Sequence, residues 1–333
     1  MKKLTRLMGI AIVLSMSILL VFPAQAQKKV EIVLQAGSKG MSGYPLTFGL
    51  GELINEKSSW LRAEAVESTG SVADARTIIE VPNAKYNHTG YGTIFTLYAA
   101  AKGEKPFKVA CELNLIACLM DATEALVTLN LNLKTPKDLV GKTVANLPAG
   151  IGNERIHRAM FEHWGIFDKV KWTHGSYEKI AQGLIDGTID IGDLPAVGVM
   201  ERQKPNPALE QLLSTGKNVY YYPIVPADVI AARKILGWPE IAYYTQPPKT
   251  ISDRQLTEKT GYLHFNAWWC HPDMDKDIVY EICRILNTNY NVFRNYHAVA
   301  TDWTADYFAK GFGMPYHAGA VKYCKDHGIK IGR

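Results

Sequence analysis

The sequence predicts an α/β protein of two domains. Its 333 residues suffice for two domains of ordinary size. Along most of the chain, segments with the alternating pattern of β-strands are followed by segments with apolar residues at helical spacing, which indicates largely parallel sheets. A strand, a glycine-rich loop and a helix at 30–57 are matched by a second set at 143–164, so we expect one such unit in each domain.

The first of these units predicts one side of a binding cleft. Three glycines in the loop 37–43 allow a tight turn and a close approach to a ligand. Ser42 suits the N-cap of the following helix, and Pro45 suits its first turn. The start of a helix offers free N–H groups and a partial positive charge, both of which favour an anion. The alternative is an ordinary turn between a strand and a helix.

Two further loops in the first half are rich in Ser, Thr, Gly and Tyr. One is the turn 67–71, which precedes a helix over 72–81, and the other is the loop 89–93, which opens a helix to about residue 101. Because ligands bind at the carboxyl ends of strands in such sheets, we expect all three loops to meet at one place. The strands expected around these loops cover 60–66, 85–88 and 107–111.

The second unit predicts the opposite side of the cleft. An apolar, β-rich stretch at 115–129 is expected to cross between the domains, and the strand 143–146, the loop 147–153 and the helix 154–164 then repeat the first pattern. The other expected elements are a capped turn at 135–139, helices at 177–184 and 229–236, strands at 188–192 and 219–222, a stiff connection at 243–250, a strand at 260–269 that returns the chain to the first domain, and helices from Met274 onward.

The chain begins with the features of a cleavable signal peptide. Basic residues precede an apolar run over 7–22, and Ala-Gln-Ala at 24–26 fits a signal-peptidase site, so we expect cleavage after Ala26. An uncleaved anchor is the alternative. No later stretch is long and apolar enough to span a bilayer, so we expect an exported protein that is not embedded in the membrane.

Charge and cysteine content narrow the function classes. Removal of Lys2, Lys3 and Arg6 lowers the formal net charge from +5 to +2, which argues against nucleic acid as a partner and leaves room for a small anion. Five cysteines are an odd number without the spacing of a small disulfide scaffold. Cys283 lies in a helical pattern and is expected to be a small buried residue, whereas Cys111–Cys118 is one of several disulfide pairings that stay open.

The sequence lacks the common signatures of catalysis. It has no zinc motif, no G-x-S-x-G nucleophile turn and no phosphate-binding P-loop, and Gly150-x-Gly152 lacks the third glycine of a dinucleotide fingerprint. His157 and His163 are six residues apart and so fall on different faces of their helix. We therefore expect no cofactor and no metal, and an enzyme is the weaker class.

Five segments in order resemble the motifs of one receptor family. The segments are Ser42-Gly43-Tyr44-Pro45-Leu46, Glu67-Ser68-Thr69-Gly70-Ser71-Val72, Pro148-Ala149-Gly150-Ile151-Gly152-Asn153-Glu154, Leu184-Ile185-Asp186-Gly187-Thr188-Ile189-Asp190 and Pro315-Tyr316-His317-Ala318-Gly319-Ala320-Val321-Lys322-Tyr323. Together they resemble the TAXI group of extracytoplasmic solute receptors of TRAP transporters. Departures from the family pattern, such as the inserted-looking 39–41, fall near the inferred cleft and concern the ligand more than the fold.

The resemblance implies a periplasmic protein with a two-domain fold like that of type II periplasmic binding proteins. It implies a signal peptide at 1–26, a first lobe formed by 27–135 with 265–333, and a second lobe formed by 136–264, joined by a hinge. The ligand, a small organic anion such as a carboxylate or an amino acid, would lie in the cleft between the lobes. The closed form would deliver it to the TRAP membrane subunits.

The ligand-binding residues expected from the loops and the resemblance come from both lobes. They are Ser38, Lys39, Ser42, Gly43, Tyr44, Ser68, Thr69, Tyr91, Thr93, Gly150, Gly152, Asn153 and Trp268. Lys39 is the one charge in the first loop and could pair with a carboxylate, its alternative being a solvated lysine. Trp268 and Trp269 alternate along a strand, so one of them is expected in the cleft and the other in the core.

Two other functions compete with the TRAP receptor. A solute receptor of an ABC-type importer would share the fold and the signal peptide. A secreted enzyme on a similar fold is the third candidate, and turnover of a bound acid would distinguish it from a receptor.

Overall fold

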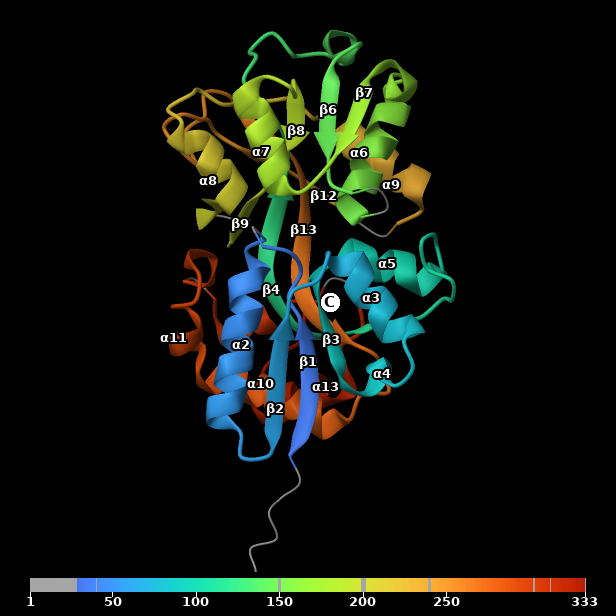
Figure 1. Cartoon of the computed structure of the whole chain (residues 1–333), viewed down its shortest axis with the longest axis vertical. Helices are drawn as coiled ribbons and strands as arrows, with labels where there is room; N and C mark the ends of the chain where they lie inside the picture. Colours follow the sequence, from blue (N-terminus) through green and yellow to red (C-terminus); the bar gives the residue numbers. More distant parts are fainter. Residues whose placement is uncertain are drawn as a thin grey trace, which may run out of the picture.

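The protein consists of two α/β units that follow one another along the long axis of the molecule (Figure 1). The structure is a computed structural model, which describes residues 29–39, 41–148, 151–198, 202–238, 241–301, 303–311 and 313–332. The expected signal peptide therefore lies outside the described residues. Each unit has its own β-sheet, which confirms the predicted α/β class with two such units.

The larger sheet has eight strands in the order β10-β9-β4-β13-β3-β1-β2, with β12 paired to β13. Its strands are β1 (Val30–Gln35), β2 (Leu61–Val66), β3 (His88–Thr93), β4 (Asn114–Glu124), β9 (Ala196–Gly198), β10 (Lys204–Pro205), β12 (Ala242–Gln246) and β13 (Lys259–Cys270). Because β1 runs parallel to both β2 and β3, the segments that follow these three strands leave from the same edge of the sheet.

The smaller sheet has five strands in the order β11-β5-β8-β6-β7. They are β5 (Leu126–Thr128), β6 (Thr143–Asn146), β7 (Lys171–His174), β8 (Ile191–Asp193) and β11 (Tyr220–Tyr221). Strand β6 runs parallel to both of its neighbours, β7 and β8, whereas β5 runs antiparallel to β8 and β11.

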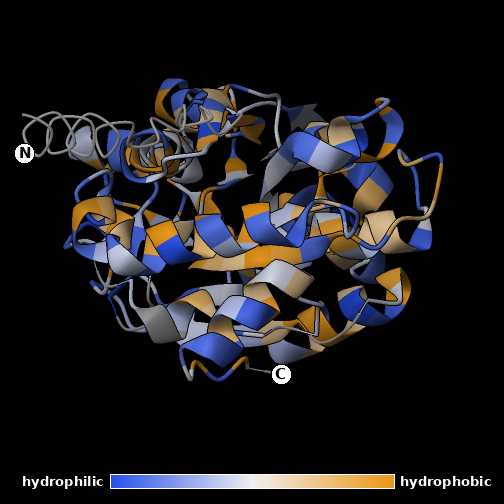
Figure 2. Ribbon diagram, turned by 90° about the horizontal axis from the view of Figure 1, so that it is seen from below, coloured by the Kyte–Doolittle hydropathy of each residue, from blue (hydrophilic) through white to orange (hydrophobic). Residues whose placement is uncertain are grey.

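Helices cover both sheets. The α-helices are α2 (Gly43–Lys57), α3 (Ser71–Glu80), α4 (Ala84–Asn87), α5 (Ile94–Lys102), α6 (Gly152–His163), α7 (Tyr177–Asp186), α8 (Pro207–Ser214), α9 (Pro226–Leu236), α10 (Lys276–Thr288), α11 (Tyr290–Phe293), α12 (Ala305–Phe308) and α13 (Ala318–Asp326). Short 3₁₀ turns are η1 (Pro136–Leu139), η2 (Phe167–Lys169) and η4 (Ala298–Ala300). Figure 2 shows the hydrophobic segments of the strands enclosed between helices of mixed hydropathy.

Two long antiparallel strands connect the units. Strand β4 leaves the larger sheet and continues after Ala125 directly into β5 of the smaller sheet. Its partner β13 brings the chain back, and the two are in register at His264 opposite Ala122 and Asn266 opposite Met120. The predicted crossing at 115–129 is confirmed, as is the returning strand at 260–269.

Local sequence signals explain the elements that were predicted well. Helix α2 has the expected N-cap at Ser42, although this side chain makes no capping hydrogen bond. Helix α7 ends at Gly187, whose φ of 73° is the left-handed conformation that glycine adopts at little cost. The turn η1 begins with a reciprocal pair of side-chain hydrogen bonds between Thr135 and Asp138.

Four expectations about secondary structure are wrong. Residues 84–87 form a helical turn, and the loop expected at 89–93 is instead strand β3 in the middle of the larger sheet. Residues 107–111 are not a strand. The stiff connection expected at 243–250 contains most of β12, which pairs with the beginning of β13.

The structure also bears on the five cysteines. All five cysteines are free, so the structure contains no Cys111–Cys118 disulfide, and Cys283 is buried as expected.

The domain boundaries after residues 135 and 264 stay a prediction. Strands β9 and β10, which fall within 136–264, are hydrogen-bonded to the larger sheet, because β9 pairs with β4.

Candidate functional site

A cavity of ≈ 270 Å³ is lined by residues from both units. The lining residues of the first half are Ser38, Lys39, Met41, Ser42, Thr69, Gly70, Ser71, Tyr91, Thr93, Met120, Ala122 and Glu124. Those of the second half are Leu147, Pro148, Ile151, Asn153, Ser176, Tyr177, Glu178, Pro195, Val197, Asn206, His264 and Asn266. Cavities at the carboxyl ends of strands and between two units are common ligand sites.

Three helices begin at this cavity without a side-chain cap. The N-cap residues are Ser42 for α2, Gly70 for α3 and Ile151 for α6, and none of them makes a side-chain hydrogen bond to its helix. No side chain therefore caps these N–H groups, although in α2 the N–H of Tyr44 donates to the carbonyl oxygen of Met41 and that of Gly43 to the hydroxyl of Tyr91. Two of the helices come from the unit of the larger sheet and one from that of the smaller sheet, so the cavity combines partial positive charge from both.

The neighbouring helices α5 and α7 differ, because their N-caps are occupied. The hydroxyl of Thr93 accepts a hydrogen bond from the N–H of Phe95, and that of Ser176 accepts one from the N–H of Lys179. Both cap residues still line the cavity.

One wall of the cavity is formed by the two connecting strands. Met120, Ala122 and Glu124 alternate along β4, and His264 and Asn266 alternate along β13, so each set lies on one face of its strand. No local pattern singles out these residues one by one. What could have indicated them is that every second residue of a strand lies on the same face, together with the expectation that both strands pass between the domains.

A buried, hydrogen-bonded pair of a carboxylate and an imidazole lies in this wall. Nε2 of His264 is 2.6 Å from Oε1 of Glu124, and the amide nitrogen Nδ2 of Asn153 donates a hydrogen bond of 2.6 Å to the same oxygen. Burial on its own would raise the pKa of Glu124, but the hydrogen bond and the charge of His264 outweigh it and hold this pKa below its usual value. Glu124 is therefore an ionised carboxylate at the surface of the cavity.

A second carboxyl group behind the wall has the opposite behaviour. Burial and the negative charge of Glu124 raise the pKa of Asp193 well above its usual value, so Asp193 is protonated. Lys259 is fully buried and donates hydrogen bonds to the carbonyl oxygen and the hydroxyl of Thr123, and burial lowers its pKa to about 7. Neither Asp193 nor Lys259 lines the cavity.

Seven of the predicted ligand-binding residues line the cavity. They are Ser38, Lys39, Ser42, Thr69, Tyr91, Thr93 and Asn153. Their contact with a ligand stays a prediction. The side chain of Lys39 is 74% exposed at the cavity and lies 3.8 Å from a carboxylate oxygen of Glu67.

Five other predicted ligand-binding residues do not line the cavity. Gly43 lies under the ring of Tyr91, where a Cβ would fall 1.9 Å from Cζ, and a Cβ on Gly152 would fall 2.4 Å from Cβ of Phe95. Both glycines thus permit close packing.

The other three are side chains with different surroundings. Tyr44 packs on Phe48 and the hydroxyl of Ser68 accepts a hydrogen bond from the N–H of Gly70. Trp268 is buried in the core, donates to the hydroxyl of Thr47 at 2.9 Å and packs on Phe293. Gly150 lies outside the described residues.

Neither tryptophan of the pair 268–269 reaches the cavity. Both are 1% exposed, because β13 is an inner strand with β3 on one side and β4 on the other, and the larger sheet is covered on both faces. Trp269 packs over Gly90 of β3, where a Cβ would fall 2.9 Å from the indole ring. The expectation that one of the two faces the cleft finds no support among the lining residues.

Two observations concern all of the described residues, not only those at the cavity. They include no cluster of three or more His, Cys, Asp or Glu side chains that could bind a metal ion. They also include no helix with the length and apolar character that a bilayer crossing requires.

The two units, the pair of connecting strands and the shared cavity define the class of protein: the fold is that of two-domain periplasmic binding proteins. The model of the NMT1-like family matches residues 34–328, and the chain belongs to this family. No curated protein sequence matches it.

One solved structure supports this fold, and two others are reported with lower TM-scores. MatC from Rhodopseudomonas palustris with bound malate has 12% sequence identity and a TM-score of 0.51, and the match covers 84% of this chain and 90% of that one. The aliphatic sulphonate binding protein SsuA from Escherichia coli has 14% identity and a TM-score of 0.44, covering 90% and 83%. A TRAP periplasmic solute binding protein from Desulfovibrio salexigens, in complex with diglycerolphosphate, has 10% identity and a TM-score of 0.45, covering 91% and 85%.

Proposed function

We propose that the protein is an extracytoplasmic solute-binding receptor that captures a small organic acid between two lobes. The observation that carries this proposal is the cavity at which three uncapped helices, α2 and α3 from one unit and α6 from the other, begin. Opposed helix N-termini can hold one carboxylate by N–H hydrogen bonds and partial positive charge, without any counter-charged side chain.

Binding would favour a closed arrangement of the lobes. A ligand that contacts both units has contacts in the closed form that the open form lacks, so it shifts the population toward closure. In this proposal, the lobes are 27–135 with 265–333 and 136–264, and β4 and β13 form the hinge region. Ser38, Ser42, Thr69, Tyr91, Thr93 and Asn153 are the proposed ligand contacts.

The proposed partner is the membrane part of a TRAP transporter of the TAXI type. The motifs that resemble this group support it, and so does an exported chain with a signal peptide at 1–26 that would place the receptor in the periplasm. A receptor of an ABC-type importer is the alternative. The membrane-protein genes next to its own would distinguish the two.

An enzyme is less well supported than a receptor. The buried groups Glu124 and His264 are paired with each other and with Asn153, and no nucleophile among the described lining residues stands beside a free base. Stoichiometric binding of an acid without its conversion would favour the receptor, and turnover would favour the enzyme.

A thermal-shift screen of organic acids and amino acids tests the proposed function. A true ligand at about 100 times its dissociation constant should raise the free energy of unfolding by about 2.7 kcal/mol and shift the melting temperature by several degrees. If no small acid produces a shift in the folded protein, the proposed ligand class is wrong.

A further inference from the structure

The charges around the cavity are unusual for a site that binds an acid. Among the described lining residues, Lys39 is the one lysine or arginine, and its side chain is largely in solvent beside Glu67. An exposed and already paired lysine contributes little to the binding of a ligand charge. Glu124 and Glu178 line the same cavity, and His264 is bound to Glu124. The side chains therefore provide no net positive charge for a ligand.

The positive potential comes from the helix N-termini that begin at the cavity. Ser42 and Ser71 mark the beginnings of α2 and α3, and Ile151 marks that of α6. A helix N-terminus carries roughly half an elementary charge, so these three helices suffice for one carboxylate.

The other lining residues include no lysine or arginine: they are apolar, acidic or neutral and polar, such as Asn206 and Asn266, and His264 is paired with Glu124. Met120 and Ala122 of β4 lie beside Val197 of β9, which pairs with Ala122, and Leu147 and Pro195 also contribute apolar surface. A second carboxylate placed here would lose its hydration without gaining a cation, and it would lie in the field of the two glutamates.

We infer that the cavity selects an acid with a single carboxylate and an apolar body, and that it discriminates against dicarboxylates. This inference rests on the proposed function, because it narrows the ligand of the same site. The carboxylate lies at the starts of α2, α3 and α6, and the hydrocarbon part lies against Met120, Val197 and Leu147.

Matched pairs of acids test the inference on the purified protein by isothermal titration calorimetry at neutral pH. Hexanoate and adipate have the same number of carbon atoms and differ in one terminal carboxylate, as do butanoate and succinate. Leucine and glutamate form a corresponding pair of amino acids. The member with a single carboxylate, which is hexanoate, butanoate or leucine, should bind at least about tenfold more tightly in each pair that binds. Hexanoate should also bind more tightly than butanoate, by about fourfold for each added methylene.

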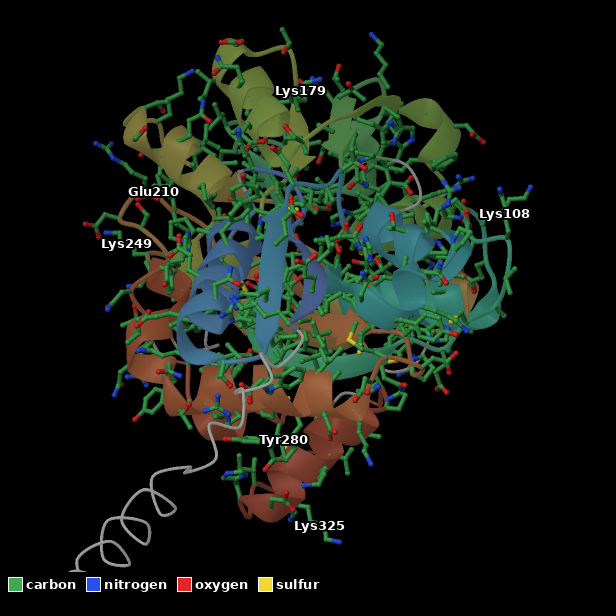
Figure 3. The ribbon with its side chains drawn as sticks, turned by 60° about the horizontal axis from the view of Figure 1, so that its bottom comes forward. Lys108, Lys179, Glu210, Lys249, Tyr280 and Lys325 are labelled. Atoms are coloured by element: carbon green, nitrogen blue, oxygen red, sulfur yellow. The ribbon has the colours of Figure 1, made fainter. Side chains whose placement is uncertain are left out.

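A variant and its control test the charge argument directly. Glu178→Gln removes a lining charge in the first turn of α7 and should reduce the preference for hexanoate over adipate at least about threefold. The control Glu210→Gln removes a charge from the first turn of α8, at the outer surface of the same unit (Figure 3), and should keep the preference of the wild type.

The outcomes separate this inference from the proposed function. Adipate, succinate or glutamate binding as tightly as its partner would overturn the inference and leave an acid receptor in place. An unchanged preference in Glu178→Gln would also overturn it. If none of the six acids binds to the folded protein, both the inference and the proposed ligand class fail.

Discussion

The hydroxyl of Ser42 has a clear expected role as a ligand contact. Ser42 is 5% exposed and lines the cavity, and its Oγ has no hydrogen-bond partner among the described residues. A buried hydroxyl without a partner costs free energy in the unliganded protein, so a ligand that supplies the partner gains it back.

We predict that Ser42→Ala weakens binding of the tightest acid in the series above by about tenfold and leaves the melting temperature of the free protein unchanged or higher. The control is Ser58→Ala. Ser58 is equally buried, but its Oγ accepts a hydrogen bond of 3.0 Å from the N–H of Leu61, so its loss should lower stability by about 1 kcal/mol and leave affinity unchanged. Calorimetry and thermal unfolding measure both quantities. Equal affinities for Ser42→Ala and the wild type would refute the assigned contact.

Asp74 gives a pH-dependent prediction at the same scale. It is fully buried, and burial raises its pKa from 3.8 to about 7, although the N–H of Tyr91 donates a hydrogen bond to its carboxylate. Between pH 3.8 and about pH 7, the folded state therefore keeps a proton on Asp74 that the unfolded state has released. Stability contributed by this proton is present below the unfolded pKa and is lost as the pH rises through the folded pKa.

The test is the variant Asp74→Asn, which keeps the shape and the acceptor oxygen but cannot ionise. The wild type should lose more stability than the variant between about pH 5 and about pH 8, by more than about 1.4 kcal/mol, which corresponds to one pKa unit. Denaturant unfolding at the two pH values measures the difference. Parallel pH dependences would show that Asp74 does not titrate in this range.

At the scale of elements, the sequence predicted those with strong local signals. Helices α2, α6 and α7 follow from runs of apolar residues at helical spacing, supported by Ser42 at the start of α2 and by Gly187 at the end of α7. The local sequence predicts a loop where strand β3 lies, because Gly90 and Gly92 are turn residues by local preference. In the structure they allow Trp269 and Ser71 to pack against the strand, which is a tertiary reason that no local pattern shows.

In the candidate site too, residues with a local sequence signal could be predicted, and residues that only the tertiary fold brings together could not. The glycine-rich loop and the turn at 67–71 identify themselves by composition, and residues from both line the cavity. Glu124 and His264 are 140 positions apart and meet only because β4 and β13 pair. Each of them, seen alone, is one acidic or basic residue in an apolar strand, so their pairing could not be predicted from the sequence.

At the scale of the whole molecule, the two units touch beside the cavity. Phe95 of α5 stacks on Trp238, which follows α9, with ring centroids 5.1 Å apart. Arg155 of α6 forms an ion pair with Glu104, which follows α5. The start of α6 at Gly152 completes this contact, because its missing side chain leaves room for Phe95. The described arrangement is thus one in which α5 and α6 are in direct contact.

Gly152→Ala tests whether this contact belongs to the liganded state. Its Cβ would fall 2.4 Å from Cβ of Phe95, so α5 and α6 must separate. We predict that hexanoate binds at least about tenfold more weakly to this variant, and that small-angle scattering shows a larger radius of gyration in saturating acid. The control is Gly51→Ala in α2, whose Cβ would lie 3.4 Å from Cβ of Ala65 within one unit, and which should keep the affinity of the wild type and gain up to about 1 kcal/mol of stability. If Gly152→Ala binds and scatters like the wild type, the contact between α5 and α6 plays no part in closure, and the proposed two-lobe mechanism loses its structural basis on this side of the cavity.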